Sequence, residues 1–365
     1  MSGHAAWAVV THAEMPNGAA HRLVRALRDA GHEVAFCATP LVGASRWRAE
    51  RCVPGRGPGL LVDETRRVPP FREPLNALEL GRFAWEVASA GYRELLLVGC
   101  DPVVFLEAAV AFAASPIRVR AKAAWFVDWS AQRLTHPVFA AAYRLATRGA
   151  VTLADVSAAI SPAAAAVVAS TAGQGHDVMV LANQPLHLGT GPAWTRRRQA
   201  VAYVGGLSAH QGVDILLEAG TTLAREGVVI DIVGDGPATG RVARAVRNQP
   251  GIRFHGLLAD RTALASVMLT ARVGWALYDP SFPMYLYGDS LKVKDYLAAG
   301  MRVVSTSPTG TSDETVTLTG YNVSSIVAAT REALTRPPTV DPTAHPSLIA
   351  AAQSLQSFVD TLTAA

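Results

Sequence analysis

The chain has 365 residues, of which half are apolar and 17% are charged. This composition excludes a disordered protein, and the length exceeds what one hydrophobic core usually covers, so we expect two packed domains. The net charge of +4 is small and the arginines are scattered, which argues against a nucleic-acid partner.

The three cysteines, Cys37, Cys52 and Cys100, are odd in number and lack metal-ligand spacing, which indicates a reducing compartment. The N-terminus lacks the basic and apolar regions of a signal peptide. The longest apolar region, residues 95–114, is interrupted by Asp101-Pro102, so it predicts a strand, a turn and a helix instead of a membrane span. We therefore expect a cytoplasmic protein without an integral membrane segment.

The first half of the chain alternates short apolar runs with amphipathic segments. Strands are predicted at residues 5–11, 33–39, 95–99, 121–127, 156–160 and 177–181, with one more near Leu60. Helices are predicted between them, including residues 76–90 and 137–153. The alternation predicts an α/β fold with a parallel sheet, in which Asn17-Gly18 marks the loop after the first strand.

A second alternating series follows a segment with linker composition. Strands are predicted at residues 201–204, 228–233, 252–255, 273–277 and 303–306, and helices at 213–225, 262–271, 325–335 and 347–363. We predict an N-terminal domain at residues 1–185, a linker at 186–198, a C-terminal domain at 199–340 and a C-terminal helix at 341–365.

The segment YGDSLKVKDYLAAG, residues 287–300, holds two of the chain's three lysines. Ser290 is predicted to cap a helix whose first backbone N–H groups lack partners within the helix, and such groups favour anions. Lys292 would add a positive charge there, whereas Lys294 should point to another face and be solvated. The alternative is an ordinary capped helix with a Lys292–Asp295 pair on its surface.

Two glycine-containing turns follow predicted strands of the second half. Gly205-Gly206 ends one strand, and Gly234-Asp235-Gly236 ends the next. Glycine at the carboxyl end of a strand allows the backbone to approach a ligand closely, but a simple tight turn uses the same residues.

Several fragments resemble glycosyltransferase family 4. YVGGLSAHQGVDILLEA, DIVGDGP, IRFHG and KVKDYLAAGMRVVST are similar, in order and spacing, to the C-terminal domain of that family. AGHEV, FVDWSAQR, ADVSAAISP and VLANQ look like its N-terminal domain. The resemblance implies a GT-B fold, with two Rossmann-like domains facing across a cleft and a C-terminal helix packing back on the first domain. It also implies a nucleoside-diphosphate sugar as the donor, held mainly by the second domain.

The resemblance assigns donor contacts to the glycine turns and to the helix start at Ser290 and Leu291. It also places Asp295 at the ribose. The family usually has a second acid at the position of Tyr287, so we expect the nearest acid, Asp289, to meet the sugar.

Two further positions depart from the family pattern. Gly206 and Gln211 stand where the family has the arginine and lysine that neutralise the diphosphate. An uncompensated diphosphate would be unstable in a cleft of low dielectric constant, so we expect Lys292 to supply the missing charge.

The resemblance places Asn17 and Gly18 near the reacting sugar, with His12 preceding them on the same loop. Asp128 follows a predicted strand and could act as a general base or position the acceptor. The alternatives are that His12 is an ordinary surface residue and that Asp128 caps a helix.

These observations predict an enzyme that transfers a sugar from a nucleoside diphosphate to a hydroxyl of a small molecule, such as a secondary metabolite, or of an envelope glycan. The resemblance implies retention of configuration, while an inverting reaction with Asp128 as base stays open. Other candidates are a nucleotide-sugar epimerase of the same fold and a two-lobed binding protein without catalysis. No metal or other cofactor is expected.

Overall fold

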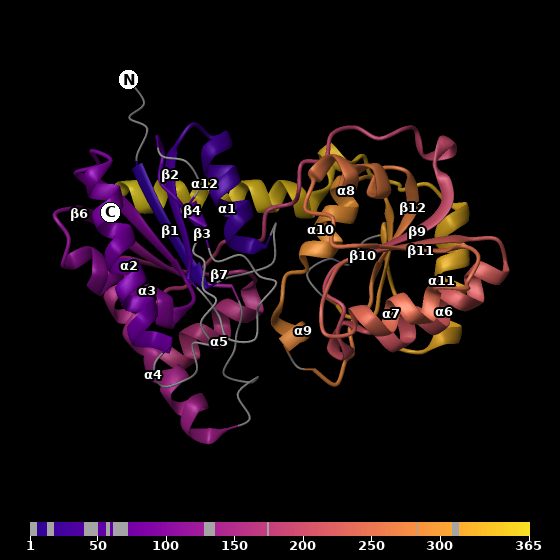
Figure 1. The fold of residues 1–365 in the computed structure, drawn as a ribbon, viewed down its shortest axis with the longest axis horizontal. Coiled ribbons are helices and arrows are strands. Elements are labelled where there is room, and N and C mark those ends of the chain that lie inside the picture. Colours follow the sequence, from indigo (N-terminus) through magenta and orange to yellow (C-terminus); the bar gives the residue numbers. More distant parts are fainter. Residues whose placement is uncertain are drawn as a thin grey trace. The chain divides into compact units, whose positions relative to one another are not determined.

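The computed structural model describes residues 6–12, 18–39, 50–55, 59–60, 72–127, 136–173, 175–282, 284–308 and 314–365. The chain forms two compact units (Figure 1). The first consists of Met1–Gln184 with Ala351–Ala365, and the second of Pro185–Ala350. Each unit is an α/β layer structure around a largely parallel sheet, as the sequence predicts.

The first unit contains an eight-stranded sheet with the order β4-β3-β2-β1-β5-β6-β7-β8. Its strands are β1 (Ala6–His12), β2 (Glu33–Thr39), β3 (Glu50–Cys52), β4 (Gly59–Leu60), β5 (Glu94–Cys100), β6 (Arg118–Phe126), β7 (Val156–Ala159) and β8 (Met179–Val180). All pairings are parallel except those of β3, which is antiparallel to β2 and β4. The strand near Leu60 is confirmed, whereas β3 was not predicted because its Glu-Arg-Cys sequence has no apolar run.

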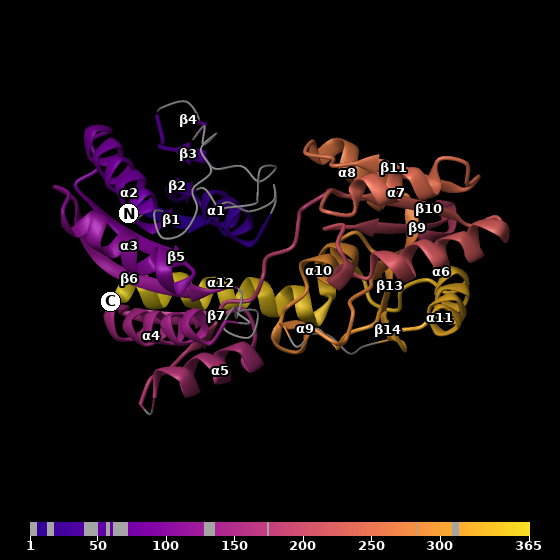
Figure 2. The same ribbon diagram turned by 60° about the horizontal axis from the view of Figure 1, so that its bottom comes forward.

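Within the described ranges, five helices of the first half pack with this sheet. They are α1 (Ala19–Asp29), α2 (Arg72–Ser89), α3 (Pro102–Ala113), α4 (Pro137–Leu153) and α5 (Pro162–Ala172), and Figure 2 shows α4 and α5 side by side. The chain's last helix, α12 (Pro346–Ala364), joins the same unit from Ala351 onward. The rings of Phe358 and Trp7 lie 6.3 Å apart, and the Ser354 hydroxyl accepts a hydrogen bond from the Ala182 N–H at 3.1 Å. The prediction that the C-terminal helix packs on the first domain is therefore confirmed.

The second unit contains a six-stranded parallel sheet with the order β11-β10-β9-β12-β13-β14. Its strands are β9 (Arg198–Val204), β10 (Val229–Val233), β11 (Ile252–Gly256), β12 (Ala271–Ala276), β13 (Arg302–Ser305) and β14 (Val316–Leu318). This order places the first and fourth strands of the unit, β9 and β12, side by side. Strand order reverses between them, which is where ligands bind in doubly wound sheets.

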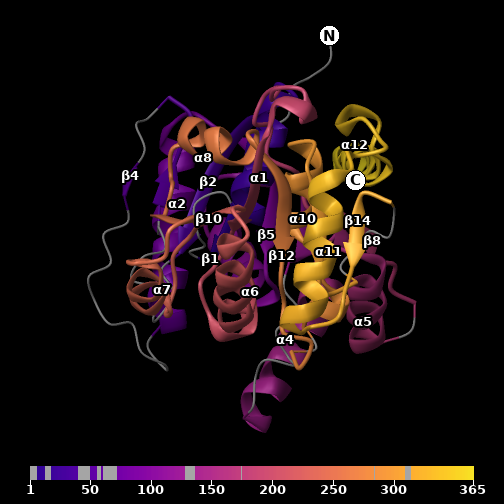
Figure 3. The same ribbon diagram turned by 90° about the vertical axis from the view of Figure 1, so that its right-hand side faces the viewer.

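Helices cover both faces of this sheet. They are α6 (Val213–Arg225), α7 (Thr239–Val246), α8 (Arg261–Met268), α9 (Met284–Tyr287), α10 (Leu291–Ala298) and α11 (Val323–Thr335), with short 3₁₀ turns η1 (Trp194–Arg196), η2 (Ala209–Gln211) and η3 (Pro342–Ala344). Side chains of α6, α7 and α11 form one core and those of α8 and α10 the other. Figure 3 shows α6 and α11 side by side. In α6 the buried Leu216, Ala219 and Leu223 share one face because they are three and four residues apart.

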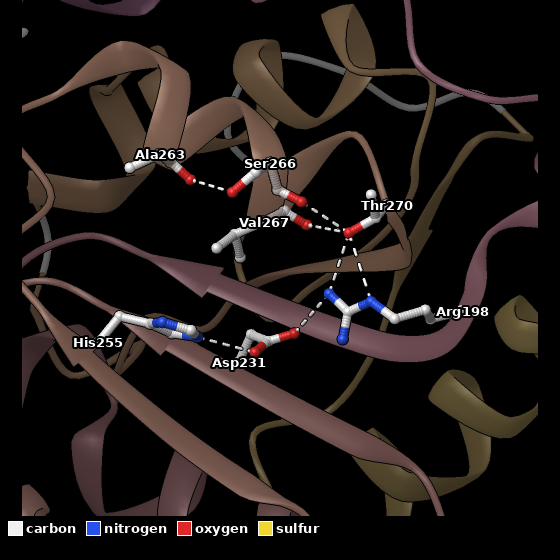
Figure 4. Close-up of polar contacts among 7 residues, drawn as sticks. All are labelled: Arg198, Asp231, His255, Ala263, Ser266, Val267 and Thr270. Atoms are coloured by element: carbon white, nitrogen blue, oxygen red, sulfur yellow. Dashed lines mark hydrogen bonds and ion pairs between the residues drawn. The ribbon is translucent and has the colours of Figure 1, made fainter.

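A buried polar network lies on the face of the second sheet that α8 covers (Figure 4). Asp231 of β10 is 1% exposed, and its carboxylate contacts Arg198 Nη2 at 2.9 Å and His255 Nε2 at 2.8 Å. Arg198 also donates to the Thr270 hydroxyl at 3.0 Å, and that hydroxyl donates to the Ser266 carbonyl of α8 at 2.7 Å. The network satisfies a buried carboxylate and joins three neighbouring strands to the end of α8.

No helix in the described ranges is both long and apolar enough to cross a lipid bilayer.

Candidate functional site

The carboxyl ends of β9 and β12 meet at the point where the strand order of the second sheet reverses. The chain leaves β9 toward α6 and leaves β12 toward α10, and these two helices belong to different cores on opposite faces. A crevice forms at such a point because the two connections diverge. The side chain of Lys292, in the first turn of α10, lies at this position between residues of both strand ends.

Lys292 is held by neutral groups. Its Nζ donates to the Tyr203 hydroxyl at 3.2 Å and to the side-chain oxygen of Gln211. It also lies 4.6 Å from the ring centroids of both Tyr203 and Tyr278, within the range of cation–π attraction. The residue is only 8% exposed, so this positive group is almost completely removed from water.

No carboxylate pairs with Lys292 within the described ranges. Burial lowers the pKa of Lys292 to about 7, because the charged ammonium loses its hydration without gaining a negative partner. A buried amine of this kind favours a bound anion, which would supply the missing negative charge.

Two glycines make this arrangement sterically possible. A Cβ at position 205 would overlap the Cε of Lys292, and a Cβ at position 234 would overlap the carbonyl oxygen of Gly205. The sequence predicts close approach of a ligand at Gly205, and the structure shows close approach of the Lys292 side chain at the same place.

The remaining residues of the two glycine turns pack the turns against each other. The Gly206 carbonyl accepts a hydrogen bond from the Tyr203 hydroxyl at 2.7 Å. The Asp235 carbonyl accepts from the Leu207 N–H at 2.9 Å, and its carboxylate accepts from the Thr239 hydroxyl at 2.6 Å. The N–H of Gly236 donates to the same hydroxyl at 2.9 Å. The structure therefore brings the turns after β9 and β10 together.

The start of α10 also adjoins the lysine. Ser290 caps the helix as predicted, since its hydroxyl accepts from the Val293 N–H at 3.3 Å. The same hydroxyl shares a 2.6 Å hydrogen bond with Tyr278, and burial raises the pKa of Tyr278 to about 12. Leu291 is the first residue of the helix and is half-buried. The helix start is thus tied to the end of β12.

The two acids of this segment have protein partners. Asp295 is 4% exposed, and its Oδ1 accepts from the Leu186 N–H at 2.9 Å. The Asp289 carboxylate lies 2.5 Å from Lys294 Nζ, and both side chains are less than a tenth exposed. The prediction that Lys294 is solvated is therefore wrong, because the buried Asp289 draws it inward. A surface pair between Lys292 and Asp295 does not form either.

Two of the predicted residues of the first unit, His12 and Gly18, lie on the connection between β1 and α1. His12 ends β1, and its Nδ1 lies 3.1 Å from the Thr39 hydroxyl at the end of β2. Gly18 precedes α1 as its N-terminal cap residue. Asn17 and Asp128 lie outside the described residues.

Sequence reasoning missed Asp101 at this edge. Thr11 pairs with Cys100, so His12 and Asp101 are the next residues along β1 and β5, between which the strand order reverses. Asp101 adopts φ 123°, and its carboxylate accepts from the Val103 N–H and from the Tyr143 hydroxyl. A non-glycine residue in this conformation marks a position worth testing for function.

In the second unit, sequence reasoning missed the tyrosines around Lys292 and the part played by Gln211. Tyr203 belongs to β9, and Tyr278 follows β12 by two residues. Their positions at the ends of predicted strands could have marked them as candidates. That they meet at one lysine, however, depends on the order of the strands in the sheet. Within the part of the chain that the structure describes, no cluster of three His, Cys, Asp or Glu side chains could hold a metal ion.

Comparison with known proteins supports the interpretation of the second unit. Residues 198–336 match the family model described as "Glycosyl transferases group 1". No curated protein sequence matches the chain.

Solved structures with the same fold cover nearly the whole chain. Sucrose-phosphate synthase from Thermosynechococcus elongatus is 14% identical, with a TM-score of 0.64 over 98% of this chain and 96% of its own. HepE from Anabaena, solved with UDP and glucose, is 13% identical, with a TM-score of 0.64 over 99% of this chain and 100% of its own. AviGT4, a glycosyltransferase of avilamycin A biosynthesis, is 14% identical, with a TM-score of 0.55 over 98% of this chain and 97% of its own. The comparisons confirm the GT-B fold and the resemblance to group 1 glycosyltransferases.

Proposed function

Taking as the premise that residues 198–336 are a group 1 glycosyltransferase domain, we propose that the chain transfers a sugar from a nucleoside-diphosphate sugar to a hydroxyl group. The observation that carries this proposal is Lys292, a buried amine at the carboxyl ends of β9 and β12 whose partners among the described residues are all neutral. The diphosphate of the donor would supply the opposite charge.

Lys292 and the start of α10 would act together on the diphosphate. The first backbone N–H groups of a helix attract anions, and an ammonium in the same turn adds a full positive charge. In a site of low dielectric constant these groups stabilise the negative charge that develops on the leaving diphosphate. The turn at Gly205-Gly206 lies against the same lysine and would adjoin the phosphates.

The reaction would proceed with retention of configuration. The leaving diphosphate would help to remove the proton of the incoming hydroxyl on the same face of the sugar, so no protein nucleophile is required. Catalysis would then depend on stabilising the leaving group and on orienting the acceptor. The contacts of Asp295 with the ribose and of Asp289 with the sugar stay predictions. Asp295 already accepts a hydrogen bond from Leu186 and Asp289 already pairs with Lys294, so each carboxylate would have to bind the ligand in addition to its protein partner.

The relatives suggest which ligands to test first. HepE was solved with UDP and glucose, so UDP-glucose is the first donor to try. AviGT4 acts in avilamycin A biosynthesis, which favours a small-molecule acceptor over an envelope glycan. His12 and Gly18 are our candidates for the acceptor side.

A thermal shift screen of the full chain against UDP, GDP, ADP, CDP and dTDP, and against their sugar derivatives, tests the donor class. A ligand at a hundredfold excess over its Kd should stabilise the protein by about 2.7 kcal/mol. If none of these compounds raises the melting temperature, the proposal fails. Incubating the binding nucleotide sugar with and without acceptors then separates transfer from isomerisation.

Replacing Lys292 with methionine tests the catalytic part of the proposal. Loss of a group that stabilises the leaving diphosphate should lower kcat by roughly a hundredfold or more. Lys122→Met is the matched control, because Lys122 belongs to the first unit and pairs with Asp155 near the surface. An unchanged kcat in Lys292→Met would remove this lysine from the mechanism.

A further inference from the structure

The side chain of Gln211 has one orientation that its neighbours permit. Its Nε2 donates to the Tyr285 hydroxyl at 3.0 Å, and its Oε1 faces Lys292. Turning the amide over would place an N–H donor against the protonated form of Lys292, which only donates. The contact with Lys292 therefore fixes the amide with its oxygen toward the lysine, and Tyr285 holds the other end.

Tyr203 is fixed in the same way. Its hydroxyl lies 2.7 Å from the Gly206 carbonyl oxygen, which can only accept, so the hydroxyl donates there. The hydroxyl oxygen is then left to accept from Lys292. Both hydrogen bonds of Lys292 are consequently made to neutral acceptors whose orientation is set by third groups.

The ionisable groups around Lys292 leave its charge unbalanced. Burial raises the pKa of Tyr203 and of Tyr278, so both rings stay neutral near pH 7. On α10 itself, Lys294 lies against the Asp289 carboxylate, and the Asp295 carboxylate accepts from Leu186. The group nearest the ammonium from the β9–α6 connection is Gln211, which carries no charge.

We propose that Gln211 is a positioning residue that holds Lys292 in place without neutralising it, so that binding of the donor diphosphate takes up a proton at Lys292 Nζ. This inference rests on the proposed function, because it concerns the same diphosphate site. The proton comes from solvent: the neutral amine becomes an ammonium, and the diphosphate becomes its counter-ion. A carboxylate at position 211 would instead neutralise the lysine in the free protein and compete with the donor.

Donor binding should weaken as the pH rises above 7. Since the pKa of Lys292 in the free protein is about 7, binding above that pH has to protonate the amine as well. The Kd should therefore rise with pH, on the order of 50-fold from pH 7 to pH 9, if the bound lysine stays charged throughout.

Lysine NMR provides a direct test, because the chain has only three lysines, Lys122, Lys292 and Lys294. Protein labelled with ¹³C-lysine should give three side-chain signals, which Lys122→Arg and Lys294→Arg would assign. The full chain is titrated from pH 6 to pH 9.5, alone and saturated with whichever of UDP, GDP, ADP, CDP and dTDP binds most tightly. We expect the Lys292 midpoint near 7 in the free protein to move upward by more than one pH unit with the ligand.

Gln211→Glu is the informative variant, and Gln249→Glu in the same unit is its control for a change of one charge. We expect Gln211→Glu to raise the Lys292 midpoint in the free protein, to weaken nucleotide binding at pH 7 at least tenfold, and to flatten the pH dependence of Kd. Gln249→Glu should bind as the unmodified protein does. A structural glutamine would tolerate glutamate, which has nearly the same size.

The outcomes separate this inference from the proposed function. Binding of a nucleoside diphosphate that leaves the Lys292 midpoint unmoved, or a Gln211→Glu protein that binds with the normal affinity and pH profile, overturns the inference alone. Absence of binding by all five nucleoside diphosphates overturns the proposed function and this inference with it.

Discussion

The side chain of Lys292 occupies the space in which a Cβ at Gly205 would lie. Gly205 directly follows β9 and Lys292 is the second residue of α10, 87 positions further along the chain. The absence of a side chain at position 205 is therefore what allows the lysine to reach Tyr203 and Gln211.

Gly205→Ala should displace the lysine. The added methyl group overlaps the lysine stem, which would have to leave its contacts with Tyr203 and Gln211. We expect a loss of stability of about 1–3 kcal/mol from overpacking and a weakening of nucleotide binding. Thermal melting with and without the nucleotide measures both effects.

Gly220→Ala is the matched control for that substitution. Gly220 lies inside α6, and a Cβ there would sit 3.7 Å from Ile230, which is ordinary contact. Alanine also favours helix more than glycine does, so stability should stay level or rise slightly. Equal destabilisation by the two alanines would contradict the steric argument at position 205.

Asp231→Ala should destabilise the second unit strongly. It removes a carboxylate that is 1% exposed and bonded to Arg198 and His255 (Figure 4). Breaking a buried charged network of this kind costs about 3–5 kcal/mol. Asp214→Ala is the control, because Asp214 pairs with Arg241 in solvent and such pairs contribute about 1 kcal/mol or less. Urea unfolding of both variants compares the two, and similar losses would argue against the network's importance.

Lys294→Met should lower the stability of the folded protein far more than Lys122→Met does. Lys294 and Asp289 are 5% and 8% exposed at their side chains, so the substitution removes the buried charge that faces Asp289. The expected loss is about 3 kcal/mol or more. The pair of Lys122 with Asp155 is 27% and 41% exposed and should contribute about 1 kcal/mol or less. A lower melting temperature for Lys122→Met than for Lys294→Met would contradict the importance of the buried Lys294–Asp289 pair.

Lys292 should make the stability of the free protein depend on pH. Its pKa is about 7 in the folded chain and near 10.5 in the unfolded chain, so the unfolded state binds more protons between these values. Stability should therefore rise with pH in this window, by about 2 kcal/mol from pH 7 to pH 9. Below pH 7 the lysine is charged in both states, so the full cost of burying its ammonium is present.

Comparison with Lys292→Met isolates this contribution, because all other groups titrate alike in both proteins. The methionine variant should be more stable at pH 6, and its advantage should shrink as the pH rises to 9. Urea unfolding at several pH values measures the difference. A constant difference across this range would show that Lys292 keeps an ordinary pKa.

Much of the fold could be predicted because it is encoded locally. Apolar runs of strand length alternate with amphipathic segments, and the predicted strand at 33–39 and helix at 213–225 agree with β2 and α6. Short or irregular elements were missed, including α7, whose Thr239–Val246 sequence is only eight residues long. The helix expected at 262–271 ends at Met268, because Ala271 already pairs with Arg198 in the sheet.

The two α/β units, the capped helix at Ser290 and the resemblance of the second half to group 1 glycosyltransferases could all be predicted from the amino-acid sequence. These depend on residue order and spacing, which are read along the chain. The surroundings of Lys292, in contrast, depend on how the strands are arranged in the folded chain. The order of the strands places β9 beside β12, and this brings Tyr203, Tyr278 and Gln211 to one ammonium group. Burial and charge balance depend on neighbours distant in sequence, so the neutral surroundings of this lysine and the inward turn of Lys294 toward Asp289 emerged only from the folded chain.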